Sequence, residues 1–96
     1  MRFSVVIPLF QEEAMVKKAV EDLVERLQPF GEGSWELVLV QNGSTDATPR
    51  LVDELAAAHA GVRAVHLPRP DYGAALRTGI FQARGDFVIG DEIDLG

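Results

Sequence analysis

The chain has 96 residues, of which 47% are apolar and 25% charged, and this predicts a single globular domain over residues 1–96. Its net charge of −6 argues against nucleic-acid binding, which needs a basic surface to contact phosphates, and its lack of cysteine excludes disulfides, thiolate zinc sites and a cysteine nucleophile. No apolar run approaches the roughly 20 residues of a membrane-spanning helix, and the first residues do not resemble a signal peptide. We therefore expect a cytoplasmic protein.

The first third of the chain predicts a strand and a helix. Phe3–Ile7 is a short apolar run closed by Pro8, which is typical of a strand buried on both faces of a parallel sheet. From Glu12 onward the apolar residues recur at helical spacing with charged residues opposite them, so an amphipathic helix follows. Its apolar stripe is Met15, Val16, Ala19, Val20, Leu23, Val24 and Leu27. Pro29 and Gly31 are expected to end it.

The middle third repeats this pattern. Trp35–Val40 predicts a second buried strand, and we expect the indole of Trp35 to anchor the core. A second helix is predicted from Thr48, which would cap it, with Pro49 at the first helical position. Gly61 would stop this helix. Its inner stripe is Leu51, Val52, Leu55 and Ala56.

The last third predicts two more strands around a third helix. Val62–His66 is a shorter and less apolar strand, and Pro68–Gly73 has the composition of a loop. Ala74–Ala83 predicts a helix, and Phe87–Ile89 a fourth strand. The order βαβαβαβ indicates the α/β class with a parallel sheet.

Handedness predicts how this sheet is arranged. Right-handed crossovers place the first two helices on one face and the third on the other, with strand order 3-2-1-4. Ligands bind such sheets at the carboxyl ends of the strands that flank the switch point, here Pro8–Glu13 and Gly90–Asp94. The apolar fourth strand, Phe87–Ile89, would lie at an unpaired edge. We therefore expect the sheet to continue in a larger domain or to be completed by a partner, such as a second copy of the chain.

An acidic cluster follows the fourth strand. In extended chain, Glu92 and Asp94 project to the same side, so they could chelate one ion, whereas Asp91 would point away. Paired carboxylates with open positions suit Mg²⁺ or Mn²⁺, which prefer oxygen ligands. The alternative is a solvated acidic loop.

Two polar clusters adjoin helix starts. Gln41–Asp46 lies between the second strand and a helix N-terminus, where amide groups can receive a polar ligand; alternatively it is a turn capped by Asp46 or Thr48. Gly73 permits close backbone approach, and Arg77, with Arg69 as a second candidate, could reach a diphosphate. The alternative is a tightly packed small-residue helix with both arginines solvated.

Several other chemistries are not supported. Ser44 has no histidine in reach, so a hydrolytic triad is not predicted. The chain has neither a GxxxxGK[ST] phosphate loop nor a GxGxxG motif after the first strand. His59 and His66 are expected to lie apart, neither with a carboxylate at ligand spacing.

Four segments, taken in order, match the motif pattern of a known family. Ser4–Glu13 (SVVIPLFQEE) is similar to the pattern VVIPxYNEE, and Val40–Thr48 (VQNGSTDAT) to VDDGSTDGT. Tyr72–Gly79 followed by Ala83–Asp86 resembles GxGAALRTGxxxAxGD, and Glu92–Leu95 falls where this pattern has a DxD metal motif. Together the four segments, which cover nearly the whole chain, resemble glycosyltransferase family 2, and most of all its polyprenyl-phosphate sugar synthase branch.

The resemblance implies a GT-A fold, with this Rossmann-like unit as its first half, a nucleoside-diphosphate sugar donor and Mg²⁺ or Mn²⁺. The family transfers the sugar, here with inversion expected, to a lipid phosphate at the membrane surface or to a saccharide. By position, the implied residues are Pro8, Phe10 and Glu12 for the nucleoside pocket, Gln41 and Asn42 for the base, Gly73 and Arg77 near the donor, and Glu92 and Asp94 for the metal.

This chain departs from the family pattern in ways that bear on function. Gln41 and Asn42 replace two acids, and Glu92 replaces the first acid of the metal motif. The family's acceptor half and catalytic base follow that motif, so no catalytic residue is assigned and the 96 residues alone are expected to transfer no sugar. The alternative function is a non-catalytic binding or assembly module that forms a homo-oligomer through the edge strand Phe87–Ile89.

Overall fold

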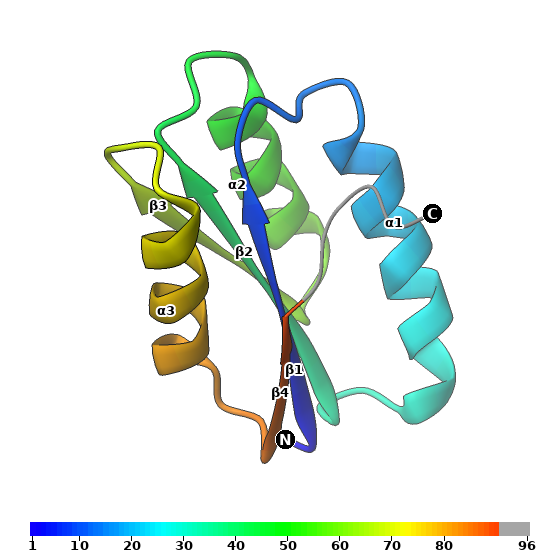
Figure 1. Cartoon of the computed structure of the whole chain (residues 1–96). Helices are drawn as coiled ribbons and strands as arrows, with labels where there is room; N and C mark the ends of the chain where they lie inside the picture. The colour runs from blue at the N-terminus through cyan, green and yellow to red at the C-terminus, as the bar shows by residue number, and fades with distance from the viewer. Residues whose placement is uncertain (91–96) are drawn as a thin grey trace.

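The computed structural model describes residues 1–90, and its strands form one parallel sheet in the order β3-β2-β1-β4, which confirms the predicted topology (Figure 1). The elements in chain order are β1 (Phe3–Leu9), α1 (Val16–Leu27), the 3₁₀ helix η1 (Gln28–Phe30), β2 (Trp35–Asn42), α2 (Thr48–Ala58), β3 (Val62–Leu67), α3 (Tyr72–Gln82) and β4 (Phe87–Gly90). None of the helices described is long and apolar enough to cross a bilayer.

Alternate side chains of the two central strands point to opposite faces, as the pleat of a strand requires. Helices α1 and α2 cover one face of the sheet and α3 covers the other (Figure 1). One set of side chains packs with α1 and α2 in the larger core cluster, and the other set packs against α3. Trp35, which is 7% exposed, belongs to the larger cluster as predicted. The larger set is Val5, Ile7, Leu9, Leu37 and Leu39, and the smaller set is Val6, Val38 and Val40.

The first strand is longer than predicted. Pro8 does not close it: β1 continues to Leu9, and Pro8 pairs in register with Val40 of β2. Within the described residues, β4 reaches only Val6 on the other side of β1. A proline is tolerated where its strand is paired on one side only, because no second ladder needs its missing N–H.

One predicted helix cap and one predicted helix start are wrong. Helix α2 begins at Thr48 as predicted, but Thr48 is its first residue and not its cap, and the Thr48 N–H donates to Asp46 Oδ1 at 2.9 Å. Helix α3 begins at Tyr72 and not at Ala74, because the carboxylate of Asp71 accepts from the Ala74 N–H at 2.9 Å. In both cases an aspartate side chain accepts from an N–H of the first turn that has no partner within the helix. Asp71 does so as the N-cap of α3, whereas Asp46 lies one residue before Ala47, the N-cap of α2.

The edge strand β4 buries little. Its side chains are all exposed, with Phe87 at 68% and Ile89 at 52%, and the α3 side chain of Phe81 is 90% exposed. Burial of apolar side chains therefore contributes little to holding β4 on β1, and its position depends on polar contacts.

Candidate functional site

The carboxyl ends of β1, β2 and β3 meet at one edge of the sheet, and the loops that follow them lie side by side there (Figure 1). Two of these loops make close contact through Gly43. A side chain at this position would place its Cβ 2.5 Å from Pro70 N and 2.7 Å from the Arg69 carbonyl carbon, and the φ of Gly43 is +67°. Only glycine fits both the left-handed backbone and the close approach.

Gln11 binds the loop after β1 to the loop after β2. Its side-chain Oε1 accepts from the Thr45 N–H at 2.6 Å and from the Asp46 N–H at 3.3 Å. Its own backbone N–H donates to Ser44 Oγ at 3.0 Å, and its φ of 54° turns the chain toward that loop. The residue that stands where the family pattern has asparagine therefore fixes the geometry of both loops.

The contacts continue toward the start of α2. The Glu12 N–H donates to Thr48 Oγ1 at 2.9 Å, the Glu13 N–H donates to Asp46 Oδ2 at 3.2 Å, and Glu13 Oε2 accepts from the Ala47 N–H at 3.0 Å. Desolvation alone would raise the pKa of Asp46, but its hydrogen bonds from Thr48 and Glu13 lower it. Asp46 therefore stays ionised and holds both loops at neutral pH.

Replacing the hydroxyl of Thr48 tests this linkage. In Thr48→Val the Glu12 N–H loses its acceptor while side-chain volume is kept, so the free energy of unfolding is expected to fall by about 1–2 kcal/mol. Thr48→Ser retains the hydroxyl and serves as the control in urea unfolding. Equal stability of the two variants, after allowance for the lost methyl group, would contradict the role of this hydrogen bond.

Asn42 joins three of the converging segments. Its Nδ2 donates to the Leu9 carbonyl oxygen at 2.9 Å, and its Oδ1 accepts from the Asp71 N–H at 2.8 Å. It is only 3% exposed. The carboxamide, which is both donor and acceptor, therefore links the end of β1, the end of β2 and the cap of α3.

Gln41 is held by a chain of polar contacts across β3 to α2. Its Oε1 accepts from the Ser44 N–H at 3.0 Å, and its Nε2 lies 3.0 Å from His66 Nδ1. Since an amide nitrogen only donates, His66 Nδ1 accepts, and His66 Nε2 donates to Asp53 Oδ1 at 2.7 Å. The sequence led us to expect no carboxylate at ligand spacing from His66, and this overlooked Asp53, whose side chain β3 and α2 bring beside the imidazole.

The remaining predicted donor-site residues differ in their exposure. Pro8 is buried, Glu12 is half-buried, and the ring of Phe10 is 45% exposed. Arg77 is exposed and its guanidinium turns back toward the start of α3, since Nη1 lies 3.2 Å from where a Cβ on Gly73 would be. Gly73 and Arg77 are therefore neighbours at the same edge of the sheet as Asn42.

The predicted metal ligands Glu92 and Asp94 lie outside the described residues, as does Asp91. Strand β4 is described as far as Gly90, which pairs with Val6 of β1. Within residues 1–90, no three acidic or histidine side chains come together as a metal-ligand group. The metal site is therefore still a prediction from the sequence.

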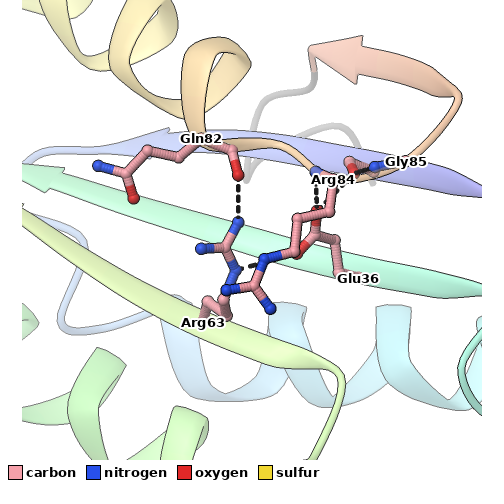
Figure 2. A network of polar contacts seen from close by, with 6 residues as sticks. Glu36, Arg63, Gln82, Arg84 and Gly85 are labelled. Carbon is pink, nitrogen blue, oxygen red and sulfur yellow. Dashed lines mark hydrogen bonds and ion pairs between the residues drawn. The ribbon is translucent and has the colours of Figure 1, made fainter. Parts of the chain in front are cut away.

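A buried cluster that was not predicted from the sequence lies at the opposite, amino-terminal ends of the strands (Figure 2). Glu36, which is 2% exposed, accepts from Ser4 Oγ at 2.6 Å, from Arg63 Nε at 2.9 Å and from the Arg84 N–H at 2.7 Å. We call Ser4, Glu36 and Arg63 the Glu36 cluster. The sequence does contain an indication of this cluster, because Glu36 is the one charged residue inside the apolar run 35–40.

The Glu36 carboxylate remains ionised despite its burial. Desolvation alone would raise the pKa of Glu36, but the hydrogen bonds from Ser4, the Arg84 N–H and Arg63, together with the positive charge of Arg63, lower it. An ionised acceptor makes stronger hydrogen bonds than a neutral one.

Comparison with known proteins identifies the family. The sequence model described as "Glycosyl transferase family 2" matches residues 4–90. The chain belongs to this family. It is 37% identical over 95 residues to the undecaprenyl-phosphate 4-deoxy-4-formamido-L-arabinose transferase of Pectobacterium carotovorum, covering 96% of this chain and 28% of that protein. It is 31% identical over 91 residues to a dolichyl-phosphate beta-glucosyltransferase of Trichomonas vaginalis, covering 90% and 28%.

Solved structures agree with the predicted GT-A fold. A mannosyltransferase of Pyrobaculum calidifontis, in complex with GDP-Man and Mn²⁺, superposes with a TM-score of 0.86 at 26% identity, over 97% of this chain and 27% of that one. S. aureus TarS in complex with UDP superposes with a TM-score of 0.85 at 26% identity, over 98% and 28%. The family 2 chain described here thus spans between a quarter and a third of the length of these relatives.

Proposed function

We propose that this chain is the donor-binding part of a glycosyltransferase that transfers sugar from a nucleoside diphosphate to a lipid phosphate or a saccharide. The observation that carries the proposal is that the fold matches a relative holding GDP-Man and Mn²⁺. The relatives named for dolichyl-phosphate and undecaprenyl-phosphate support a lipid-phosphate acceptor. With such an acceptor, the protein would work as a cytoplasmic enzyme at the inner face of the membrane.

The donor would bind over the edge of the sheet where the loops meet. There the exposed ring of Phe10 offers an apolar face to the nucleoside, and Arg77 offers a cation to the diphosphate beside Gly73. Pro8 and Glu12 would complete the nucleoside wall. Gln41 and Asn42, whose amides are engaged by the chain's own groups, would act on the base through the loop geometry that they hold or through their remaining donors and acceptors.

A divalent ion would be held by Glu92 and Asp94. Carboxylate oxygens fit Mg²⁺ and Mn²⁺, and in the sequence these residues directly follow β4, the strand that pairs with the central strand β1. When bound, the ion would stabilise negative charge on the departing diphosphate. We propose that the 96 residues bind the donor without transferring sugar, since they span about 28% of the relatives' length.

Thermal unfolding with UDP, GDP, dTDP and CDP, each with Mn²⁺ or EDTA, tests donor binding. At ten times Kd a ligand adds about 1.4 kcal/mol, or roughly 6–11 °C for a domain of this size. A metal-dependent shift with one nucleotide is expected, and it should be absent in the double variant Glu92→Ala, Asp94→Ala. No shift with any nucleotide in a cooperatively folded sample would contradict the proposal.

A second candidate function is a homo-oligomeric assembly module. It is favoured by the exposed edge β4, in which Phe87, Val88 and Ile89 are 68%, 40% and 52% exposed. Unpaired apolar edges of this kind are templates for strand pairing. Light scattering after size exclusion is expected to show an oligomer that Val88→Lys disperses, and a monomer at all concentrations would contradict this function.

A further inference from the structure

The Glu36 cluster lies at the end of the sheet opposite the proposed donor site, yet it contacts the segment that leads into β4 (Figure 2). The Arg84 N–H donates to Glu36 Oε2 at 2.7 Å, and the Gly85 N–H donates to Ser4 Oγ at 2.9 Å. Arg63 Nη2 also donates to the Gln82 carbonyl oxygen at 2.6 Å. Three strands thus hold the connection between α3 and β4.

These contacts fix the chain immediately before the edge strand. Gly85 lies so close to β1 that a Cβ on it would be 2.5 Å from the Phe3 carbonyl carbon. Two residues later the Phe87 N–H donates to the Arg2 carbonyl oxygen at 3.1 Å, and the ladder with β1 begins at Phe3 paired with Phe87. The register of β4 is therefore set at residues 84–87.

Little else in the described structure could set that register. Strand β4 pairs over only four residues, from Phe87 to Gly90, and all of its side chains are exposed. A slip of one residue would turn every side chain to the other face of the sheet, and burial would not oppose it strongly. The acidic segment begins at Asp91, directly after β4 in the sequence, so a slip would also change the residue of β1 opposite Gly90, from which that segment continues.

We propose that the Glu36 cluster is a positioning device that fixes the register of β4 on β1 and thereby places the acidic segment for metal binding. The second half of this inference rests on the proposed donor function. Ser4, Glu36 and Arg63 act through β4 and touch neither nucleotide nor metal. Loss of the contacts of this cluster would weaken metal binding although the cluster lies at the opposite end of the sheet, and the loops around Asn42 would keep their geometry.

The chain offers a matched pair of variants at the fully buried Ser4. Ser4→Val and Ser4→Thr add similar volume, but only Ser4→Thr keeps the hydroxyl that joins Glu36 Oε2 to the Gly85 N–H. In Ser4→Val, hydrogen exchange at the amides of residues 87–90 is expected to be roughly tenfold faster than in Ser4→Thr, with unchanged exchange in β2 and β3. Glu36→Gln, which keeps the side-chain shape, is the second variant should Ser4→Val fail to fold.

Mn²⁺ affinity distinguishes a role in placing the acidic segment from a purely structural role, which would leave this affinity unchanged. In the presence of the preferred nucleoside diphosphate, Mn²⁺ affinity is expected to fall roughly tenfold in Ser4→Val and to be retained in Ser4→Thr. Nucleotide affinity in EDTA should be the same in both. A loss of Mn²⁺ affinity with unchanged nucleotide affinity would indicate misplaced acids and not a general loss of stability.

Two results would overturn the inference. One is β4 exchange in Ser4→Val and Glu36→Gln that equals exchange in Ser4→Thr, and the other is faster β4 exchange with unchanged Mn²⁺ affinity. If the unaltered chain binds nucleotide but no Mn²⁺, the proposed metal site and the metal-placing half of the inference are wrong. The exchange data then decide, on their own, whether the cluster fixes β4.

Discussion

Glu36→Ala is expected to lower the free energy of unfolding at pH 7 by about 3 kcal/mol, the low end for a broken buried ion pair because Arg63 keeps some access to solvent. The substitution removes the acceptor of Ser4 Oγ, of Arg63 Nε and of the Arg84 N–H. Urea unfolding measures the loss. Glu54→Ala is the control, because its ion pair with Arg50 is exposed and should contribute no more than about 1 kcal/mol.

The difference in the free energy of unfolding between the unaltered chain and Glu36→Ala should depend on pH. The pKa of Glu36 is lower in the folded chain than in the unfolded one, so its contribution is fully present above the unfolded value near 4.5. That contribution is lost as the pH falls through the folded pKa. The stability difference is therefore expected to be constant from pH 6 to 8 and to shrink below about pH 4.5, and a difference that grows on acidification would contradict this assignment.

Asn42→Asp, which restores the acid of the family pattern, is expected to destabilise this chain by about 2–3 kcal/mol at pH 8. The Leu9 carbonyl oxygen lies 2.9 Å from Asn42 Nδ2, and a carboxylate there would lose the hydrogen bond and repel that oxygen in a buried place. Protonation would give the new carboxyl a donor. Its pKa is therefore raised by folding, and the stability deficit should diminish as the pH falls.

Gln41→Glu is the matched control for that substitution. Its neighbour is the ring nitrogen Nδ1 of His66, which can take a proton and donate to a carboxylate, whereas the Leu9 carbonyl oxygen cannot. Gln41→Glu should therefore cost less stability than Asn42→Asp. Equal costs for the two substitutions would contradict the role of the Asn42 amide as a donor.

The sequence predicted the topology well because apolar runs and helical stripes depend on local spacing. Phe3–Ile7 and Trp35–Val40 lie in or against the core as expected, and so does the predicted helical stripe from Val16 to Leu27. Met15, the first residue of that predicted stripe, is instead 43% exposed because it precedes α1. The handedness of crossovers then gives the strand order. Helix starts were less predictable. Helix α2 begins at Thr48 as expected but with Ala47 as its N-cap residue, and α3 begins at Tyr72, two residues before the predicted Ala74, because Asp71 caps it.

The polar partners could not be predicted, because they are far apart in the sequence. Glu36 contacts Ser4, which is 32 residues away in the sequence, and the Arg84 N–H, which is 48 residues away. His66 of β3 contacts Asp53 of α2. A charged residue inside an apolar strand indicates that a partner exists, but only the packed sheet identifies it.

We propose above all that this family 2 chain holds a nucleoside diphosphate together with a divalent ion. Calorimetric titration of the chain with the nucleotide that gives the largest thermal shift, in Mn²⁺ and in EDTA, is the decisive experiment. We expect nucleotide binding to weaken by roughly tenfold or more in EDTA, because the ion offsets the charge of the diphosphate. Binding of equal strength with and without Mn²⁺, or no binding to the folded chain, would contradict it.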